Sequence, residues 1–89
     1  MYFLLLSMMA IGGSNYIVLT YTQLIAATDL TYIPQVSGDM QTWKSGAGYV
    51  APVSVTPNAD GITETVSVRD TTPVSRGAPR FIRLMVTGP

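Results

Sequence analysis

The 89-residue chain contains no cysteine and no histidine. Without thiols it can form neither a disulfide framework nor a thiolate metal site, and without imidazole it lacks the commonest general base and the commonest metal ligand. These two absences exclude Ser–His and Cys–His catalysis and ordinary zinc chemistry. The sequence therefore predicts no catalytic residues, no metal site and no cofactor.

Charge is also scarce, since charged residues make up 11% of the chain and hydrophobic residues 47%. A soluble domain has roughly 25% charged residues, so we expect part of this surface to be covered by another surface. Residues 69–89 hold four Arg and one Asp, whereas residues 1–68 hold one Lys and four acids. These arginines lack the interleaved aromatics of a nucleic-acid site, so they predict a solvated strand face and no nucleic-acid partner.

The first segment, Met1 to Ile11, is apolar except for Ser7. It is shorter than the roughly 20 residues of a membrane-spanning helix, and no positive residue precedes it as in a signal peptide. We therefore expect no membrane span and find no convincing signal peptide, although a leader remnant stays an alternative for Met1 to Ile11. The segment is treated as an apolar N-terminal segment over residues 1–13, ended by two glycines. It is either a strand buried on both faces or a short buried helix. Residues 14–89 are expected to form one domain.

The rest of the chain shows alternation of period two, typical of strands. Such runs cover residues 16–23, 29–37, 49–56, 62–69 and 80–87, and clusters of turn-forming residues separate them. The pattern predicts an all-β fold: a small antiparallel β-sandwich, Greek-key or immunoglobulin-like, with about five to seven strands. Residues 70–79, with two prolines, are expected to form a long surface crossing.

Two details of this pattern make further predictions. Pro34 cannot donate a ladder hydrogen bond, so its strand must lie at an edge or carry a bulge there. Asp60-Gly61 supplies the backbone of a hairpin turn between the third and fourth runs. The alternation places side chains on shared faces: Leu30, Tyr32 and Val36 in one strand; Tyr49, Ala51, Val53 and Val55 in the next; Ile62, Val66 and Val68 facing inward in the strand after it.

Short motifs lie along the same strands: Tyr21-Thr22, Ala26 to Tyr32, Val36 to Asp39, Trp43, Val66 to Asp70 and Phe81 to Leu84. They resemble a C-terminal β module found at the ends of large secreted and surface bacterial proteins. The resemblance covers roughly Tyr16 to Thr87, and it implies a β fold and a secreted or cell-surface location. This sequence departs from the pattern at Gln23, Pro34 and Met85, and residues 1–13 have no counterpart in it.

The best candidate ligand site is aromatic. Trp43 and Tyr49 could form a platform on which a sugar ring stacks, as in many secreted β-sandwich modules. The competing interpretation makes Trp43 the large aromatic plug of a small core, because it follows a tight turn beside the 29–37 strand. The carboxylates fall at strand ends, in turns or on a strand, and their spacing indicates no paired catalytic acids.

These observations predict a non-catalytic structural or attachment module that self-associates, with a carbohydrate-binding module as the alternative. The expected partner is a second copy in a dimer, or a neighbouring domain of a larger chain; a glycan is the partner in the alternative. The doubly apolar first segment and the outward face of the last strand predict the interface. Its candidate residues are Tyr2, Phe3, Leu5, Met9, Phe81, Arg83 and Met85.

Overall fold

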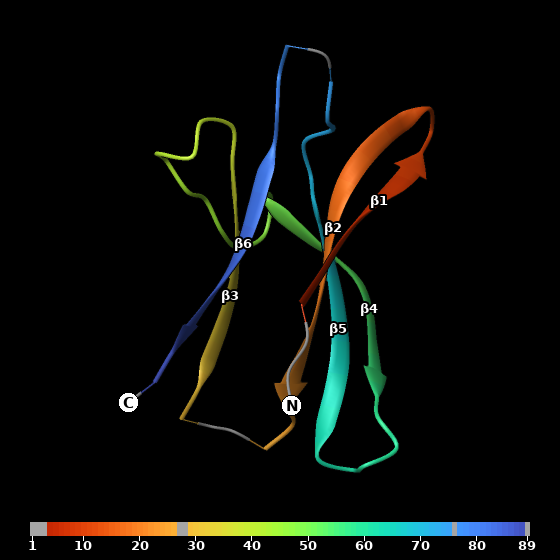
Figure 1. Cartoon of the computed structure of the whole chain (residues 1–89), viewed down its shortest axis with the longest axis vertical. Helices are drawn as coiled ribbons and strands as arrows, with labels where there is room; N and C mark the ends of the chain where they lie inside the picture. Colours follow the sequence, from red (N-terminus) through yellow and green to blue (C-terminus); the bar gives the residue numbers. More distant parts are fainter. Residues whose placement is uncertain (1–3, 27–28, 76, 89) are drawn as a thin grey trace.

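The computed structural model of the chain describes residues 4–26, 29–75 and 77–88. These residues form six strands and no helix, which confirms the all-β prediction. The strands are β1 (Leu4–Ile11), β2 (Ser14–Leu24), β3 (Thr31–Ser37), β4 (Val50–Pro57), β5 (Thr63–Asp70) and β6 (Phe81–Thr87) (Figure 1).

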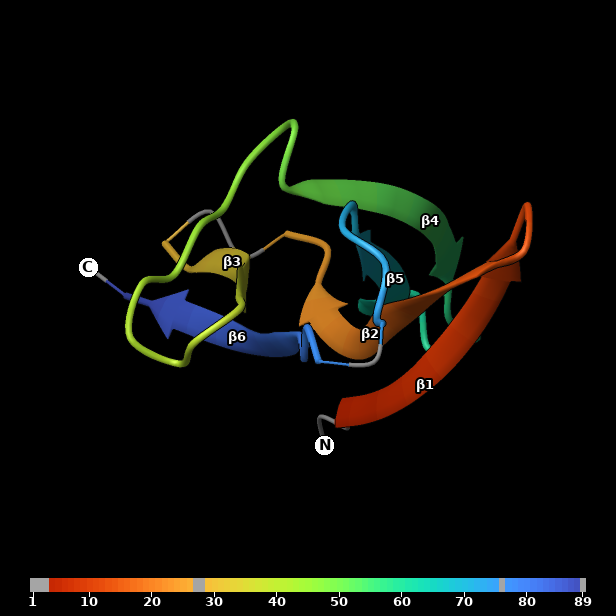
Figure 2. The same cartoon turned by 90° about the horizontal axis from the view of Figure 1, so that it is seen from above.

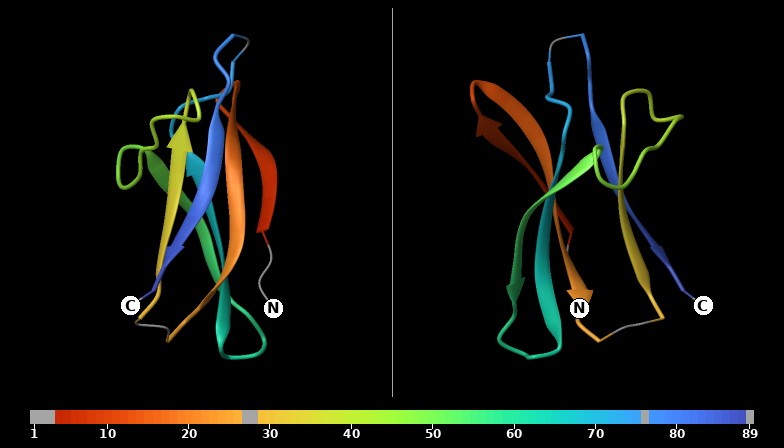
Figure 3. Two further views of the ribbon diagram at one scale, coloured as in Figure 1. Left: turned by 60° about the vertical axis from the view of Figure 1, so that its left-hand side comes forward. Right: turned by 180° about the vertical axis from the view of Figure 1, so that it is seen from behind.

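The strands form two antiparallel sheets. One has the order β1-β2-β5-β4, and the other pairs β3 with β6. The small sheet packs across the large one, with β6 against β2 and β3 against β4 (Figures 2 and 3). The predicted sandwich is therefore confirmed. Its order is that of the constant-type immunoglobulin sandwich, in which strands 1-2-5-4 face strands 3-6-7; the described residues supply the first six.

The core lies where the two sheets overlap. Inward side chains of β2 and β5 form its centre, and the small sheet covers them. The Tyr21 and Tyr32 rings stack across the gap with centroids 6.1 Å apart. The buried apolar side chains and the stacked tyrosines determine which face of each sheet packs against the other. The core side chains are Leu19, Tyr21, Val66 and Val68, with Tyr32, Val50, Ile82 and Leu84 packed against them.

One buried ion pair also joins the sheets. Asp70 ends β5 and is 0% exposed, while Arg80 directly precedes β6. Arg80 donates through Nε to Asp70 Oδ2 at 2.7 Å and through a second nitrogen to Oδ1 at 3.2 Å. The Thr72 N–H donates to the same carboxylate at 3.0 Å. The pair joins the two ends of the crossing between β5 and β6. The sequence predicted a solvated face for the arginines, so this buried role of Arg80 was not expected.

The first segment is a strand, but the expectation that it is buried is wrong. Over Leu4–Ile11 only Met9 is half-buried, and the other side chains are exposed. The small sheet reaches only as far as β2, so nothing lies opposite β1 in the part of the chain that the structure describes (Figure 2). Residues 1–3 lie outside the described residues.

The predicted faces of the β4–β5 hairpin are wrong in two places. Val50 and Pro52 pair with the inward side of β5, but a β-bulge between Pro52 and Ser54 shifts the register by one residue. Because a one-residue shift reverses the faces, Val55 pairs with inward Val66 while Ala51 points outward. Ile62 belongs to the turn and is 61% exposed.

We predict that Arg80→Met destabilises the fold by about 3 kcal/mol, because it leaves a buried carboxylate without its counter-ion. Arg80→Lys keeps the charge but loses the two-nitrogen geometry, so its loss should be smaller. Urea unfolding of both variants measures the effect. A loss below about 1 kcal/mol for Arg80→Met would mean that the pair behaves like an exposed one.

The β4–β5 turn generates a prediction about pH. Asp60 accepts hydrogen bonds from the Ile62 and Thr63 N–H groups, both at 2.9 Å, and from the Thr63 hydroxyl at 2.7 Å. The Thr63 and Ile62 N–H groups, followed by that hydroxyl, lower the pKa of Asp60 below its ordinary value of 3.8. Because the folded-state pKa is lowered, this stabilisation is present above pH 3.8 and is lost as the pH falls through the folded pKa.

Thermal unfolding of the wild type and Asp60→Asn between pH 7 and pH 2 tests this. The wild type should be more stable at neutral pH, and the gap should close in acid. Parallel curves over the whole range would contradict the assignment.

Candidate functional site on the open side of the sandwich

The two sides of the sandwich differ in how their strand edges are protected. At the β4 edge, Pro52 and Pro57 lack an N–H and a bulge interrupts the strand. At the β3 edge, the N–H and C=O of Val36 both bond to Lys44, at 2.8 and 2.9 Å. Alternate residues of a strand face the same edge, so Pro34 faces the same edge as Val36 and its missing N–H costs no hydrogen bond to β6. Of the two predicted settings for Pro34, an edge or a bulge, the structure shows the edge. This side is closed to further pairing.

The opposite side, formed by β1 and β6 and here called the open side, has no such protection. Strand β1 pairs with β2 through every residue and carries no charge, proline or bulge. Gly12 and Gly13 form a two-residue turn with φ of 57° and 86°, so Ile11 and Ser14 are a hydrogen-bonded pair. Counting back from Ile11, four residues turn their backbone groups to the free edge: Leu4, Leu6, Met8 and Ala10.

The free edge of β6 follows by the same reasoning. Val36 pairs with Ile82 but makes its hydrogen bonds to Lys44, away from β6. The Ile82 backbone groups must then face away from β3, and those of Leu84 and Val86 face the same way. Because β6 packs against β2, this free edge lies on the side where β1 extends.

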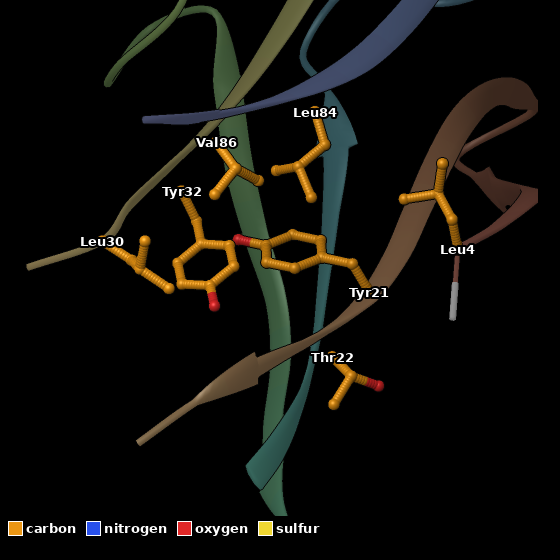
Figure 4. A pocket seen from close by; sticks show the side chains of 7 residues that line it. All are labelled: Leu4, Tyr21, Thr22, Leu30, Tyr32, Leu84 and Val86. Carbon is orange, nitrogen blue, oxygen red and sulfur yellow. The ribbon is translucent and has the colours of Figure 1, made fainter. Parts of the chain in front are cut away.

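Two cavities lie along the open side. The first, of about 300 Å³, has Leu84 and Val86 of β6 above the stacked tyrosines and Leu4 of β1 at its far side (Figure 4). The second, of about 380 Å³, joins Leu6 and Ile17 to the start of β6. Together they form an apolar groove between β1 and β6. Its other lining residues are Tyr21, Thr22, Leu30 and Tyr32 in the first cavity, and Met40, Trp43, Arg80, Phe81, Ile82 and Arg83 in the second.

The β1 side chains that line this groove are largely in solvent, since Leu4 is 59% and Leu6 58% exposed. The chain exposes 5657 Å² in all. A compact monomer of 9.5 kDa should expose about 5,000 Å². The excess of about 600 Å² approaches one partner's share of a standard protein interface, about 800 Å².

The two aromatic candidates do not form one platform. Trp43 lines the 380 Å³ cavity, where the Arg83 guanidinium lies 4.0 Å from its ring centroid. Arg83 is held there by its Nε hydrogen bond to Gln35 Oε1 at 2.7 Å, so one face of the indole is covered. Tyr49 lines a separate, more polar cavity of about 310 Å³. Trp43 is half-buried outside the core, so the plug interpretation is wrong.

The predicted interface residues are also divided. Leu5 and Met9 pair with Thr20 and Tyr16 on the outer face of the large sheet. Phe81, Arg83 and Met85 lie on the outer face of the small sheet, with Arg83 against Trp43. Because the sheets pack face to face, these outer faces point in opposite directions. The even-numbered β1 residues, which the sequence did not single out, are the ones that approach β6; Tyr2 and Phe3 lie outside the described residues.

The acids and tyrosines with a shifted pKa do not form a charged site on the open side. Burial, and then the charges of Glu64 and Tyr32, raise the pKa of Tyr21 above 10.0. Asp39 caps a turn and lines neither cavity of the groove, and hydrogen bonds from the Thr42 and Gln41 N–H groups and the Ser37 hydroxyl lower its pKa. Within residues 4–26, 29–75 and 77–88, no three acids gather as metal ligands. The open side therefore offers backbone hydrogen bonds and apolar contacts.

The chain matches no family model, no curated protein and no solved structure. Among the residues that the structure describes, no helix is long and apolar enough to cross a membrane.

The covered indole makes a prediction about sugar binding. We expect the wild type to bind no sugar through Trp43, because Arg83 already occupies one face of the ring. A glycan array with the wild type, Trp43→Ala and, as the matched control, Tyr49→Ala checks this. Binding that disappears in a folded Trp43→Ala protein and persists in Tyr49→Ala would support the carbohydrate-binding alternative.

Proposed function

We propose that the chain is a non-catalytic attachment module that self-associates through β1. The observation that carries the proposal is the contrast between sheet edges: prolines, a bulge or a loop protect β4 and β3, whereas β1 is regular, apolar and exposed. An unprotected edge of this kind is a template for pairing with another strand. The motif resemblance supports a secreted or cell-surface setting.

A second copy suits the β1 edge because two-fold pairing brings each residue near its own counterpart. Any charged residue at the edge would then lie near a like charge of the second copy. Residues 1–28 contain no Asp, Glu, Lys or Arg, so pairing of two β1 strands meets no such repulsion. The self-pairing is antiparallel. One register joins all of the edge-facing residues, with Leu4 opposite Ala10 and Leu6 opposite Met8 of the second copy. The two-fold axis then passes beside Ser7.

We predict that the wild type is a dimer and that Met8→Lys raises its dissociation constant at least tenfold. The substitution places two like charges at the β1 edge, and Met8 is already exposed, so the fold should survive. Light scattering over a concentration series measures the change. Val53→Lys, at the bulge of the opposite edge, is the matched control and should remain dimeric.

A cysteine variant locates the axis. Ser7→Cys would place two thiols across a non-hydrogen-bonded pair, where Cα atoms lie about 4.5 Å apart, within disulfide range. Because the chain has no natural cysteine, any disulfide dimer comes from this position. Mild oxidation should cross-link Ser7→Cys rapidly and Ser54→Cys, on β4, slowly. A wild type that stays monomeric at tens of micromolar would refute self-association.

A further inference from the structure

Among residues 4–26, 29–75 and 77–88, no strand of the small sheet lies opposite β1 of the large sheet. In the immunoglobulin order, a seventh strand pairs with the sixth and faces the first. Here β6 has a free edge on that side, β1 extends beneath it, and the described residues supply no further strand. The groove described above therefore occupies the position of a seventh strand.

The groove fits an extended chain because it presents main-chain groups as well as apolar walls. The free edge of β6 offers the N–H and C=O groups of Ile82, Leu84 and Val86, which only an extended backbone can pair in sequence. Every second side chain of such a strand would point down toward Leu4 and Leu6. It would fill the two cavities and cover these exposed β1 side chains.

Self-pairing of β1 does not remove this site. Pairing at the β1 edge satisfies backbone groups, but the inward side chains of Leu4 and Leu6 still face the space beside β6. A β6–β6 pair of two copies fails for a geometric reason. If two β6 strands paired one spacing apart, about 4.8 Å, β1 of each copy would be forced into the space that β2 of the other copy occupies, because β6 lies against β2 and β1 is the next strand of the large sheet. The occupant must be a strand without a second sheet attached.

Charge narrows the chemistry of that strand. Arg83 is the one charged residue of β6, and it points outward next to Trp43. Arg80 is occupied by the buried Asp70, and the side chains beneath the groove are apolar. A matching strand has apolar residues at inward positions and an acidic residue at the outward position beside Arg83.

We propose that the open side binds an extended segment of another polypeptide, which adds to β6 as the seventh strand. The segment alternates β-branched apolar residues with hydroxyl residues and carries one acid opposite Arg83. This site goes beyond the self-association proposed above and uses the other strand of the open side.

A blocked synthetic peptide, acetyl-Thr-Val-Thr-Val-Glu-Val-Thr-Val-Thr-amide, tests the proposal on the full chain. Binding should raise the unfolding temperature with peptide concentration and slow amide hydrogen exchange at Ile82, Leu84 and Val86. Trp43 is the one tryptophan of the chain and lines the groove, so its fluorescence should titrate in parallel. A peptide with the central Glu replaced by Lys should bind at least fivefold more weakly.

The control variant is Val86→Pro, which removes one N–H at the free edge of β6 but no hydrogen bond to β3. It should fold, remain dimeric and bind the peptide at least tenfold more weakly. A peptide in which the Val before the central Glu is replaced by Pro should not bind, because the residues on either side of Glu are the ones whose N–H groups face β6. Because Val86→Pro leaves β1 unchanged and Met8→Lys leaves the β6 edge unchanged, the two proposals can fail separately.

Three outcomes would overturn the strand-binding proposal. The first is no response to millimolar peptide. The second is peptide binding that Val86→Pro does not weaken. The third is a wild-type dimer that dissociates in Val86→Pro and not in Met8→Lys, which would make a second copy the occupant of the β6 edge.

Discussion

The buried pair of Asp70 and Arg80 is the constraint on which the rest of the sandwich depends. It links the end of β5 in the large sheet to the start of β6 in the small sheet, so it sets where the 71–80 crossing begins and ends. Arg80 also lies against the turn after β3, where a Cβ added at Gly38 would come within 3.1 Å of its guanidinium. Loss of the partner of a fully buried carboxylate is strongly destabilising, so the pair favours one relative position of the two sheets.

That position determines which surfaces are left over. With β6 held against β2 and β3 against β4, the two-stranded sheet spans from β2 to β4, and β1 projects past it (Figure 2). Prolines, a bulge and a loop protect the β4 and β3 edges, and the described residues provide no such protection at β1 and β6. The exposed apolar side chains of β1 and the unprotected backbone edges of β1 and β6 therefore lie on one side of the molecule. The two proposals divide this side between them: the β1 edge pairs with its own copy, and the β6 edge pairs with a separate strand.

Much of this arrangement was visible in the sequence because strand periodicity is local. The runs with period two predicted five of the strands, the glycine pair after Ile11 ended β1, and Pro34 placed its strand at an edge. The sharing of one face by Leu30, Tyr32 and Val36 needed only regular alternation, and the structure confirms it for Tyr32 and Val36, which pair with inward residues of β6. Prediction failed at the β4 bulge, because no local signal showed which residue the ladder would skip.

The sequence by itself determined the class of fold and the surplus of apolar surface, since both follow from composition and from the order of residues in each strand. Only the tertiary structure decided which apolar strand is covered. Leu19 and Leu6 are a matched pair in neighbouring strands, yet Leu19 is 0% exposed and Leu6 is 58% exposed. The difference comes from β6, which lies far away in the sequence and packs over β2 and stops there. Burial depends on what lies opposite a strand, and that is a property of the packed sheets and not of the strand's own residues.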